Sequence, residues 1–282
     1  MSRFTTPDGL SLYYETHGNR DGLPLICLPG LTRDGQDFRY ALPHLSAYHV
    51  ILLDLRGRGR SDYAEDPSSY NILTEAGDVI ALMDHLGLAR AALLGTSRGG
   101  LVAMAIAGTA RDRLSAVILN DVGPDIADEG LGRIFDYLGR RPAAKTHAEA
   151  AQTREAVMAP AFPGVPSQRW LEEAQTFYKQ TPDGLELRYD ARLRDAMLAQ
   201  AAALAEMEEK PSLWPWFAAL DGLPAGVIRG AHSDILSAET YAEMQRRLPA
   251  LRAVELPDRG HIPFLDEPAA LALIHDVLKD AQ

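Results

Sequence analysis

Uninterrupted apolar runs recur along the first half of the chain, and each ends in glycine or polar residues. They read PLICLPG, HVILLDLRG, AALLGTS and SAVILNDVG. Continuous apolar runs of this length are typical of strands that are buried on both faces of a sheet. Two further strand-like segments, AGVIRG and RAVELPD, follow near the C-terminus. Ahead of all these, RFTT and LSLYYET flank a PDG turn, so the chain is predicted to open with a β-hairpin.

Helical patterns separate the predicted strands. Helices are predicted over residues 36–46, 74–86, 98–110, 238–247 and 268–279. Because strand and helix alternate, we predict an α/β fold with a mainly parallel, doubly wound sheet.

Residues 123–219 interrupt this alternation. Alanine, glutamate and arginine with helical spacing dominate there, and no buried-strand run occurs. We therefore predict one α/β core domain, residues 1–122 and 220–282, with residues 123–219 inserted as a helical cap. A chain of 282 residues that is 46% hydrophobic is large enough to bury a full core.

The charge balance is acidic. The formal net charge is -11 and the pI is near 5.2, and no basic tract offsets this excess, so neither nucleic acid nor an anionic membrane surface is an expected partner. The N-terminus lacks a basic start followed by an apolar segment, and no stretch approaches the roughly 18 apolar residues of a membrane span. The single cysteine, Cys27, cannot form an intrachain disulfide. These features favour a cytoplasmic protein.

Ser97 lies in GTSRG, a G-x-S-x-G sequence between a predicted strand and a predicted helix. In such an elbow the serine occupies a sharp, strained turn, and the helix N-terminus beside it stabilises negative charge. The backbone N–H of Arg98 would then donate to an oxyanion. The alternative is that the glycines only allow the helix to pack closely, so partners for Ser97 are needed.

A serine nucleophile needs a histidine base and an acid that orients it. His261 follows the last predicted strand, and Asp234 follows the strand before it, so both are expected at the same edge of the sheet as Ser97. The order Ser97, Asp234, His261 is the one expected of this fold. Asp121, at the end of SAVILND, is the second choice for the acid.

With these residues the sequence resembles the α/β-hydrolase superfamily over nearly its whole length. The resemblance includes GTSRG, LPGLTRD after one strand and DLRGRGRSD after the next. It implies an eight-stranded sheet with a helical cap, and a second oxyanion N–H from Leu31. Pro29 stands where many members have histidine, and Arg98 is larger and more basic than the residue frequently found after the nucleophile.

The predicted pocket residues are less specific. Arg33 or the Arg98 side chain could pair with a substrate carboxylate, although Arg98 could equally be bound to a core carboxylate. Trp214 and Phe217, in the predicted cap, are candidates for an apolar lid, or else anchor the cap to the core. In DLRGRGRSD, Asp62 replaces the last glycine of a dinucleotide motif, so Asp54, Arg56 and Arg60 are interpreted as residues that brace the oxyanion loop. No metal-ligand pattern occurs, and no cofactor is expected.

These features together predict a metal-free serine hydrolase. It would cleave an ester or lactone of a small hydrophobic substrate through an acyl-enzyme. The alternatives are a carbon–carbon hydrolase like the meta-cleavage product hydrolases that the chain also resembles, a perhydrolase or cofactor-independent oxygenase, and a ligand-binding pseudo-hydrolase. A serine at position 97 disfavours haloalkane dehalogenase and epoxide hydrolase activity, because those relatives attack with aspartate.

Overall fold

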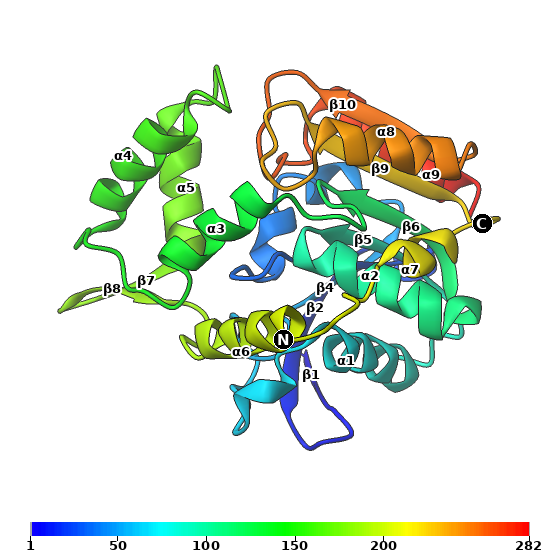
Figure 1. Cartoon of the computed structure of the whole chain (residues 1–282), viewed down its shortest axis with the longest axis horizontal. Coiled ribbons are helices and arrows are strands. Elements are labelled where there is room, and N and C mark those ends of the chain that lie inside the picture. The colour runs from blue at the N-terminus through cyan, green and yellow to red at the C-terminus, as the bar shows by residue number, and fades with distance from the viewer. Residues whose placement is uncertain (1, 282) are drawn as a thin grey trace.

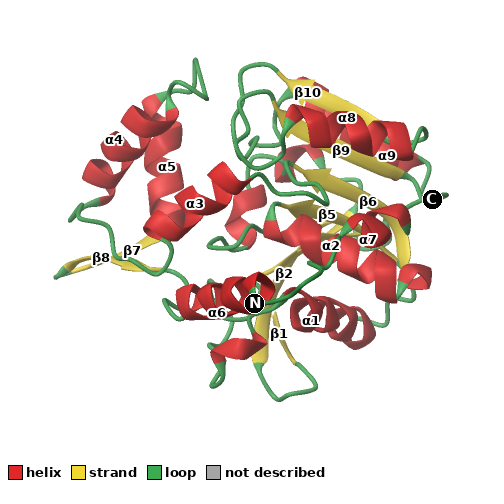
Figure 2. Ribbon diagram, in the orientation of Figure 1, coloured by secondary structure: helices red, strands yellow, loops and turns green. Residues whose placement is uncertain are grey.

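An eight-stranded sheet forms the centre of the protein, whose computed structural model describes residues 2–281 (Figures 1 and 2). The strands, in their order across the sheet, are β1 (Ser2–Thr5), β2 (Ser11–Gly18), β4 (His49–Leu53), β3 (Pro24–Leu28), β5 (Ala91–Thr96), β6 (Leu114–Asn120), β9 (Ala225–Gly230) and β10 (Arg252–Leu256). β1 and β2 form the predicted hairpin, and β2 also pairs antiparallel with β4. All other pairs are parallel. The predicted mainly parallel α/β sheet is confirmed.

Helices cover both faces of the sheet because its central strands are apolar on both sides. In β3, Ile26 and Leu28 face one core layer, whereas Leu25 and Cys27 face the other. The first layer is closed by α1 (Ile72–His85), α2 (Arg98–Thr109), α7 (Trp214–Ala218) and α8 (Ala238–Arg247). The second layer is closed by α9 (Pro268–Lys279) and two short 3-10 helices.

Side-chain caps fix the start of two helices in this core. The Asn71 side chain accepts a hydrogen bond from Thr74 N at the start of α1, and Ser237 accepts from Thr240 N at the start of α8. Each such cap satisfies a backbone N–H that the helix itself cannot, and stabilises the helix by about 1 kcal/mol.

The helix predicted over residues 36–46 is wrong. This segment forms two 3-10 helices, Gly35–Phe38 and Leu42–His44. The reason is Pro43, which has no backbone N–H to donate and whose ring clashes with the preceding turn of an α-helix.

The insertion, which we define as the chain between β6 and α7, lies to one side of the sheet (Figure 1). It contains α3 (Asp128–Tyr137), α4 (His147–Met158), α5 (Ser167–Phe177), α6 (Leu193–Ala205) and the hairpin of β7 (Tyr178–Thr181) and β8 (Gly184–Leu187). The sequence analysis missed this hairpin because its strands are only four residues long and contain no continuous apolar run. Helix α7 falls within the predicted cap but packs on α2 of the core.

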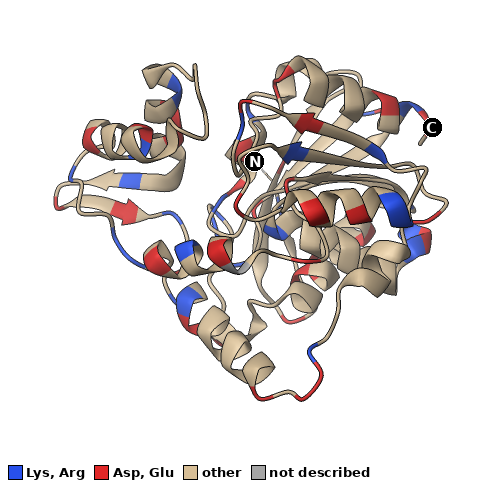
Figure 3. Ribbon diagram, turned by 45° about the horizontal axis from the view of Figure 1, so that its top comes forward, with Lys and Arg blue, Asp and Glu red and all other residues tan. Residues whose placement is uncertain are grey.

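Charged residues are spread over both the core and the insertion (Figure 3). Within residues 2–281, no helix is both long enough and apolar enough to cross a bilayer. The same residues contain no group of three or more His, Cys, Asp or Glu side chains arranged to hold a metal ion.

Candidate active site

Ser97 occupies a strained turn between β5 and α2. Its backbone φ is 49° and ψ is -113°, a conformation that residues with a side chain rarely adopt. The neighbouring glycines make the turn possible: a Cβ on Gly95 would lie 2.5 Å from the oxygen of Gly99, and one on Gly99 would lie 2.1 Å from the oxygen of Leu28. The glycines therefore allow close packing and, by doing so, present Ser97 at the carboxyl edge of the sheet.

His261 links Ser97 to a buried carboxylate. His261 Nε2 lies 3.0 Å from Ser97 Oγ, and His261 Nδ1 lies 2.7 Å from Asp121 Oδ2. Asp121 is completely buried and also accepts hydrogen bonds from Gly230 N at 2.8 Å and Ser233 Oγ at 2.6 Å. Because the carboxylate accepts a hydrogen bond from Nδ1–H, the proton of the neutral imidazole stays on Nδ1 and Nε2 is left free to accept the serine proton.

The predicted pairing of His261 with Asp234 is corrected by this geometry. Asp121, the second choice, ends β6, which lies between β5 and β9 in the sheet, so its carboxylate emerges among the other two groups. Asp234 lies four positions beyond the end of β9, where it pairs with Arg133 at 3.2 Å on the wall of the cavity described below. From the same loop, Ser233 is the residue that contacts Asp121.

Two backbone N–H groups lie beside Ser97 without an acceptor in residues 2–281. They belong to Leu31, in the loop after β3, and to Arg98, the first residue of α2. The loop after β3 approaches the nucleophile closely, since a Cβ on Gly30 would lie 3.9 Å from Ser97 Cβ. The residues predicted for the oxyanion hole are thus next to Ser97, and their donors are available.

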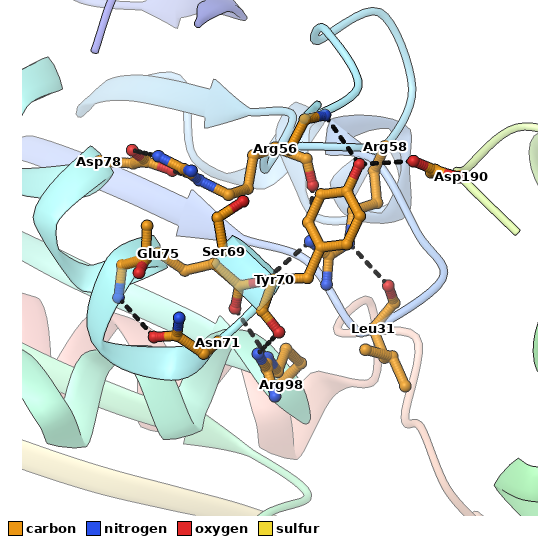
Figure 4. Close-up of polar contacts among 12 residues, drawn as sticks. Leu31, Arg56, Arg58, Ser69, Tyr70, Asn71, Glu75, Asp78, Arg98 and Asp190 are labelled. Carbon is orange, nitrogen blue, oxygen red and sulfur yellow. Dashed lines mark hydrogen bonds and ion pairs between the residues drawn. The ribbon is translucent and has the colours of Figure 1, made fainter. Parts of the chain in front are cut away.

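A buried ion network holds both of these loops (Figure 4). The Glu75 carboxylate, which is fully buried, accepts from Arg58 Nη1 at 2.8 Å and from Arg98 Nε at 2.7 Å. Arg58 Nε in turn donates to the carbonyl oxygen of Leu31 at 2.9 Å. Burial opposes ionisation of Glu75, but the charges of the two arginines outweigh it and hold the Glu75 pKa below its usual range.

This arrangement decides between the two roles considered for the Arg98 side chain. It is bound to Glu75 and, at 3.3 Å, to the carbonyl oxygen of Tyr70, and so is not available to a substrate. The Tyr70 hydroxyl donates to Asp190 of the insertion at 2.6 Å (Figure 4). The network therefore connects the insertion to the residue that follows the nucleophile.

The DLRGRGRSD loop packs against the loop that follows β3. Asp54 accepts from Gly35 N at 2.8 Å and from Arg60 N at 2.9 Å. Burial, together with the nearby Asp34, raises the pKa of Asp54 to about 6. Arg56 is paired with Asp78 at 2.5 Å. The contact of Asp54 with Gly35 supports the predicted bracing role, whereas the Arg56 side chain binds α1 rather than the loop after β3.

A cavity of about 760 Å³ opens over the catalytic edge of the sheet, and Ser97 and His261 lie in its wall. The insertion and the loop after β10 provide most of its apolar lining. These residues include Ile134, Val157, Met158, Phe162, Trp170 and Phe264. Trp170 is buried and meets the rings of Phe162 and Phe264 edge-on.

Trp214 and Phe217 do not line this cavity, so their prediction as substrate contacts is wrong. Phe217 is completely buried in the core layer that contains α2. Trp214 packs against the same layer, and its indole N–H donates to Asp125 at 2.7 Å. Both residues anchor α7 to the core, which is the alternative role that the sequence left open.

Arg33 lines the cavity, but its charge is already matched. Its guanidinium pairs with Glu173 at 2.7 Å and with Asp37, and it stacks 3.9 Å from the centre of the Phe177 ring. A second arginine, Arg154, comes from the insertion and also lines the cavity. Its guanidinium carbon stacks 4.3 Å from the centre of the same ring. The sequence analysis missed Arg154, because nothing in the pattern of α4 shows which side faces the cavity.

The fold and the site together define a hydrolase of the α/β type. The family model described as "alpha/beta hydrolase fold" matches residues 24–268, and the chain belongs to this family. It is 35% identical over 275 residues to the 3-hydroxybutyrate-oligomer hydrolase of Cupriavidus necator. This alignment covers 95% of this chain and 93% of that protein. The family resemblance is confirmed, and the protein is an α/β-hydrolase enzyme.

Solved structures agree with this assignment. An α/β hydrolase from Novosphingobium aromaticivorans matches with a TM-score of 0.89 and 36% identity, covering 99% of this chain and 97% of that chain. The enol-lactonase from Burkholderia xenovorans has a TM-score of 0.74 over 99% of this chain and 100% of that chain, but at 23% identity it shows the fold alone.

Proposed function

We propose that this enzyme is a serine hydrolase that cleaves the ester bond of a small substrate through an acyl-enzyme. The observation that carries the proposal is the hydrogen-bonded series Ser97, His261, Asp121, which opens into a cavity large enough for a small molecule. No metal or cofactor takes part in the proposed steps.

In the first half-reaction, Ser97 Oγ forms a bond to the ester carbonyl carbon while its proton moves to His261 Nε2. Asp121 stabilises the imidazolium that results. The carbonyl oxygen becomes an oxyanion, and the N–H groups of Leu31 and Arg98 donate to it. When the tetrahedral intermediate collapses, the C–O bond to the alcohol portion breaks, and His261 gives its proton to the departing oxygen.

In the second half-reaction, water attacks the acyl carbon. His261 Nε2 accepts a proton from this water, and a second oxyanion forms in the same position. Collapse releases the carboxylic acid, and the proton returns from His261 to Ser97. The enzyme thus ends each cycle in the state in which it began.

The substrate class is supported by the relative and by the cavity. The Cupriavidus necator relative is named for hydrolysing oligomers of 3-hydroxybutyrate, and it is similar to this chain along nearly its whole length. The apolar wall formed by residues such as Val157, Met158 and Phe162 suits the hydrocarbon part of a short ester. We therefore propose short linear esters of hydroxy acids as the substrates.

The test compares wild type with Ser97→Ala on p-nitrophenyl butyrate. We expect kcat to fall by at least about 1000-fold in the variant, because the three residues act as a unit. Ser68→Ala is the matched control, since Ser68 is an exposed serine that is hydrogen-bonded only locally. A fluorophosphonate should label Ser97 in wild type, as located by mass spectrometry. Turnover that persists in Ser97→Ala, or label on another residue, would overturn the mechanism.

A further inference from the structure

Arg154 is a cation without a full partner in the wall of the catalytic cavity. It lies on α4, and its guanidinium makes no hydrogen bond within residues 2–281. Its Nε is buried and has no acceptor among the residues that the structure describes. The nearest carboxylate oxygen, Glu173 Oε2, is 3.9 Å from Nη2, beyond hydrogen-bond distance.

The charges around Arg154 do not balance. Arg33, Arg39 and Arg154 share two carboxylates, those of Asp37 and Glu173. Glu173 is closer to Arg33, at 2.7 Å, and to Arg39, at 3.4 Å, than to Arg154. Counting ion pairs within 4 Å, the three guanidinium groups face two carboxylates, and Arg154 is the one that lies farthest from its partner.

Partial burial also disfavours the charged form of this side chain, which is 30% exposed. It lowers the pKa of Arg154 below the ordinary value of arginine, and the attraction of Glu173 does not compensate. An anion bound beside the guanidinium would restore the balance.

The guanidinium is also held in place. Phe177 lies between Arg33 and Arg154, with the two guanidinium carbons 3.9 Å and 4.3 Å from the ring centre. Stacking on an aromatic face orients the planar group and leaves its N–H edge free to donate. The remaining arginines of the cavity wall, Arg133, Arg140 and Arg141, are exposed to water, which screens their charge.

We propose that Arg154 binds a free carboxylate of the substrate, and that the enzyme therefore prefers esters with a carboxylate at one end. This inference rests on the proposed ester hydrolysis and specifies its substrate class. A guanidinium edge fits a carboxylate through two parallel hydrogen bonds. A doubly charged phosphate is disfavoured, because Glu173 and Asp37 lie in the same cluster and repel further negative charge.

The path from the nucleophile to Arg154 fits such a substrate. Ser97 adjoins Gly30, Gly30 adjoins the Arg33 side chain, and Arg33 and Arg154 share the Phe177 ring. The carboxylate is thus bound away from the scissile carbonyl, and the apolar residues of the insertion line the space beside this path. A linear ester with a hydrocarbon middle and one charged end matches this distribution.

The experiment measures a ratio of kcat/KM values on substrates that differ only in the charged end. One set consists of mono-p-nitrophenyl esters of glutaric, adipic and pimelic acids and their methyl-capped counterparts, which carry the charge on the acyl portion. The other pair is the linear 3-hydroxybutyrate dimer and its methyl ester, which carry the charge on the alcohol portion. Each is measured with wild type, Arg154→Gln, Arg154→Lys and Arg141→Gln at one fixed salt concentration.

We expect the ratio of charged to capped substrate to fall about 10- to 100-fold in Arg154→Gln in at least one set, which is the worth of a hydrogen-bonded charge pair. Arg154→Lys should recover part of the ratio, since it keeps the charge and loses the paired geometry. Arg141→Gln removes an equal charge from an arginine that is 67% exposed and paired with Glu186, and should leave the ratio unchanged.

The outcomes separate the inference from the function on which it rests. A ratio unchanged in Arg154→Gln in both sets, with the capped esters still cleaved, would overturn the carboxylate site and leave ester hydrolysis intact. An equal fall of this ratio in Arg141→Gln would also overturn the carboxylate site, because the effect would then come from long-range electrostatics of the cavity and not from a direct contact with Arg154. If Arg154→Gln does not fold, the test uses Arg154→Lys. A ratio of charged to capped substrate equal to that of wild type in both sets would then overturn the carboxylate site. Failure of wild type to cleave any of the esters would instead refute the proposed function.

Discussion

Replacing Asp121 by asparagine tests which carboxylate orients His261. Asp121 Oδ1 accepts from Gly230 N, and Oδ2 accepts from Ser233 Oγ and His261 Nδ1. In Asp121→Asn the amide oxygen still accepts from Gly230, because the backbone N–H of Gly230 can only donate a hydrogen bond. The amide NH2 group therefore faces His261. The imidazole must then accept at Nδ1 and carry its proton on Nε2, where it can no longer take the proton of Ser97.

The size of the effect follows from this change of tautomer and from the loss of the charge that stabilises the imidazolium. We expect kcat to fall about 10³- to 10⁴-fold. This corresponds to about 4–5.5 kcal/mol of transition-state stabilisation at about 1.4 kcal/mol for each factor of ten. Within the described part of the chain, Asp234 pairs only with Arg133, which is 63% exposed, so Asp234→Asn should reduce kcat by less than about fivefold.

The assay is steady-state hydrolysis of p-nitrophenyl butyrate by wild type, Asp121→Asn and Asp234→Asn, with thermal unfolding of each to confirm that it is folded. Asp234→Asn serves as the matched control, because it makes the same chemical change on the same cavity side of the sheet. A loss in Asp234→Asn as large as that in Asp121→Asn would refute the assignment of Asp121.

Three other perturbations probe the surroundings of the site. Glu75→Gln leaves two buried guanidinium groups without their carboxylate, so stability should fall by about 3–5 kcal/mol and kcat should fall with it; an unchanged unfolding temperature would contradict the role of the network. The raised pKa of Asp54 means that its contribution to stability is fully present below pH 3.8 and is lost as the pH rises through about 6. The decline in unfolding temperature between about pH 4 and about pH 7 should therefore be smaller in Asp54→Asn, and equal declines would show that another group is responsible. Phe217→Ala should destabilise the fold by about 3–5 kcal/mol while leaving KM for esters unchanged, and a changed KM would place Phe217 back in the pocket.

Much of the fold was predictable because the central strands are buried on both faces. Such strands need continuous apolar runs, and runs of this kind are distinctive in a sequence. The exceptions have local causes. Pro43 breaks a helix whose hydrophobic spacing is otherwise regular, and the strands of the β7–β8 hairpin are too short to produce an apolar pattern.

The site was predictable only in part. Ser97 and His261 follow strands of the sheet, and parallel strands bring their carboxyl ends to one edge. The order of the residues could not identify the acid, because Asp121 and Asp234 both lie between Ser97 and His261. The acid is determined by the position of β6 between β5 and β9 in the sheet, which brings Asp121 to His261. The loop after β9 instead turns Asp234 toward Arg133. The orientation of helix faces in the insertion depends on tertiary packing, which is why Arg154 escaped notice.

The place where the insertion joins the core would allow this segment to be exchanged, as one continuous piece, between related proteins. It leaves after β6, and the chain returns through α7 to β9, so that the insertion is flanked by strands that are paired neighbours in the sheet. A chimaera could thus take its pocket walls from one parent and its nucleophile, base and acid from another. The upstream crossover must fall after Asp121, and the downstream one before α7, because Phe217 is packed in the core.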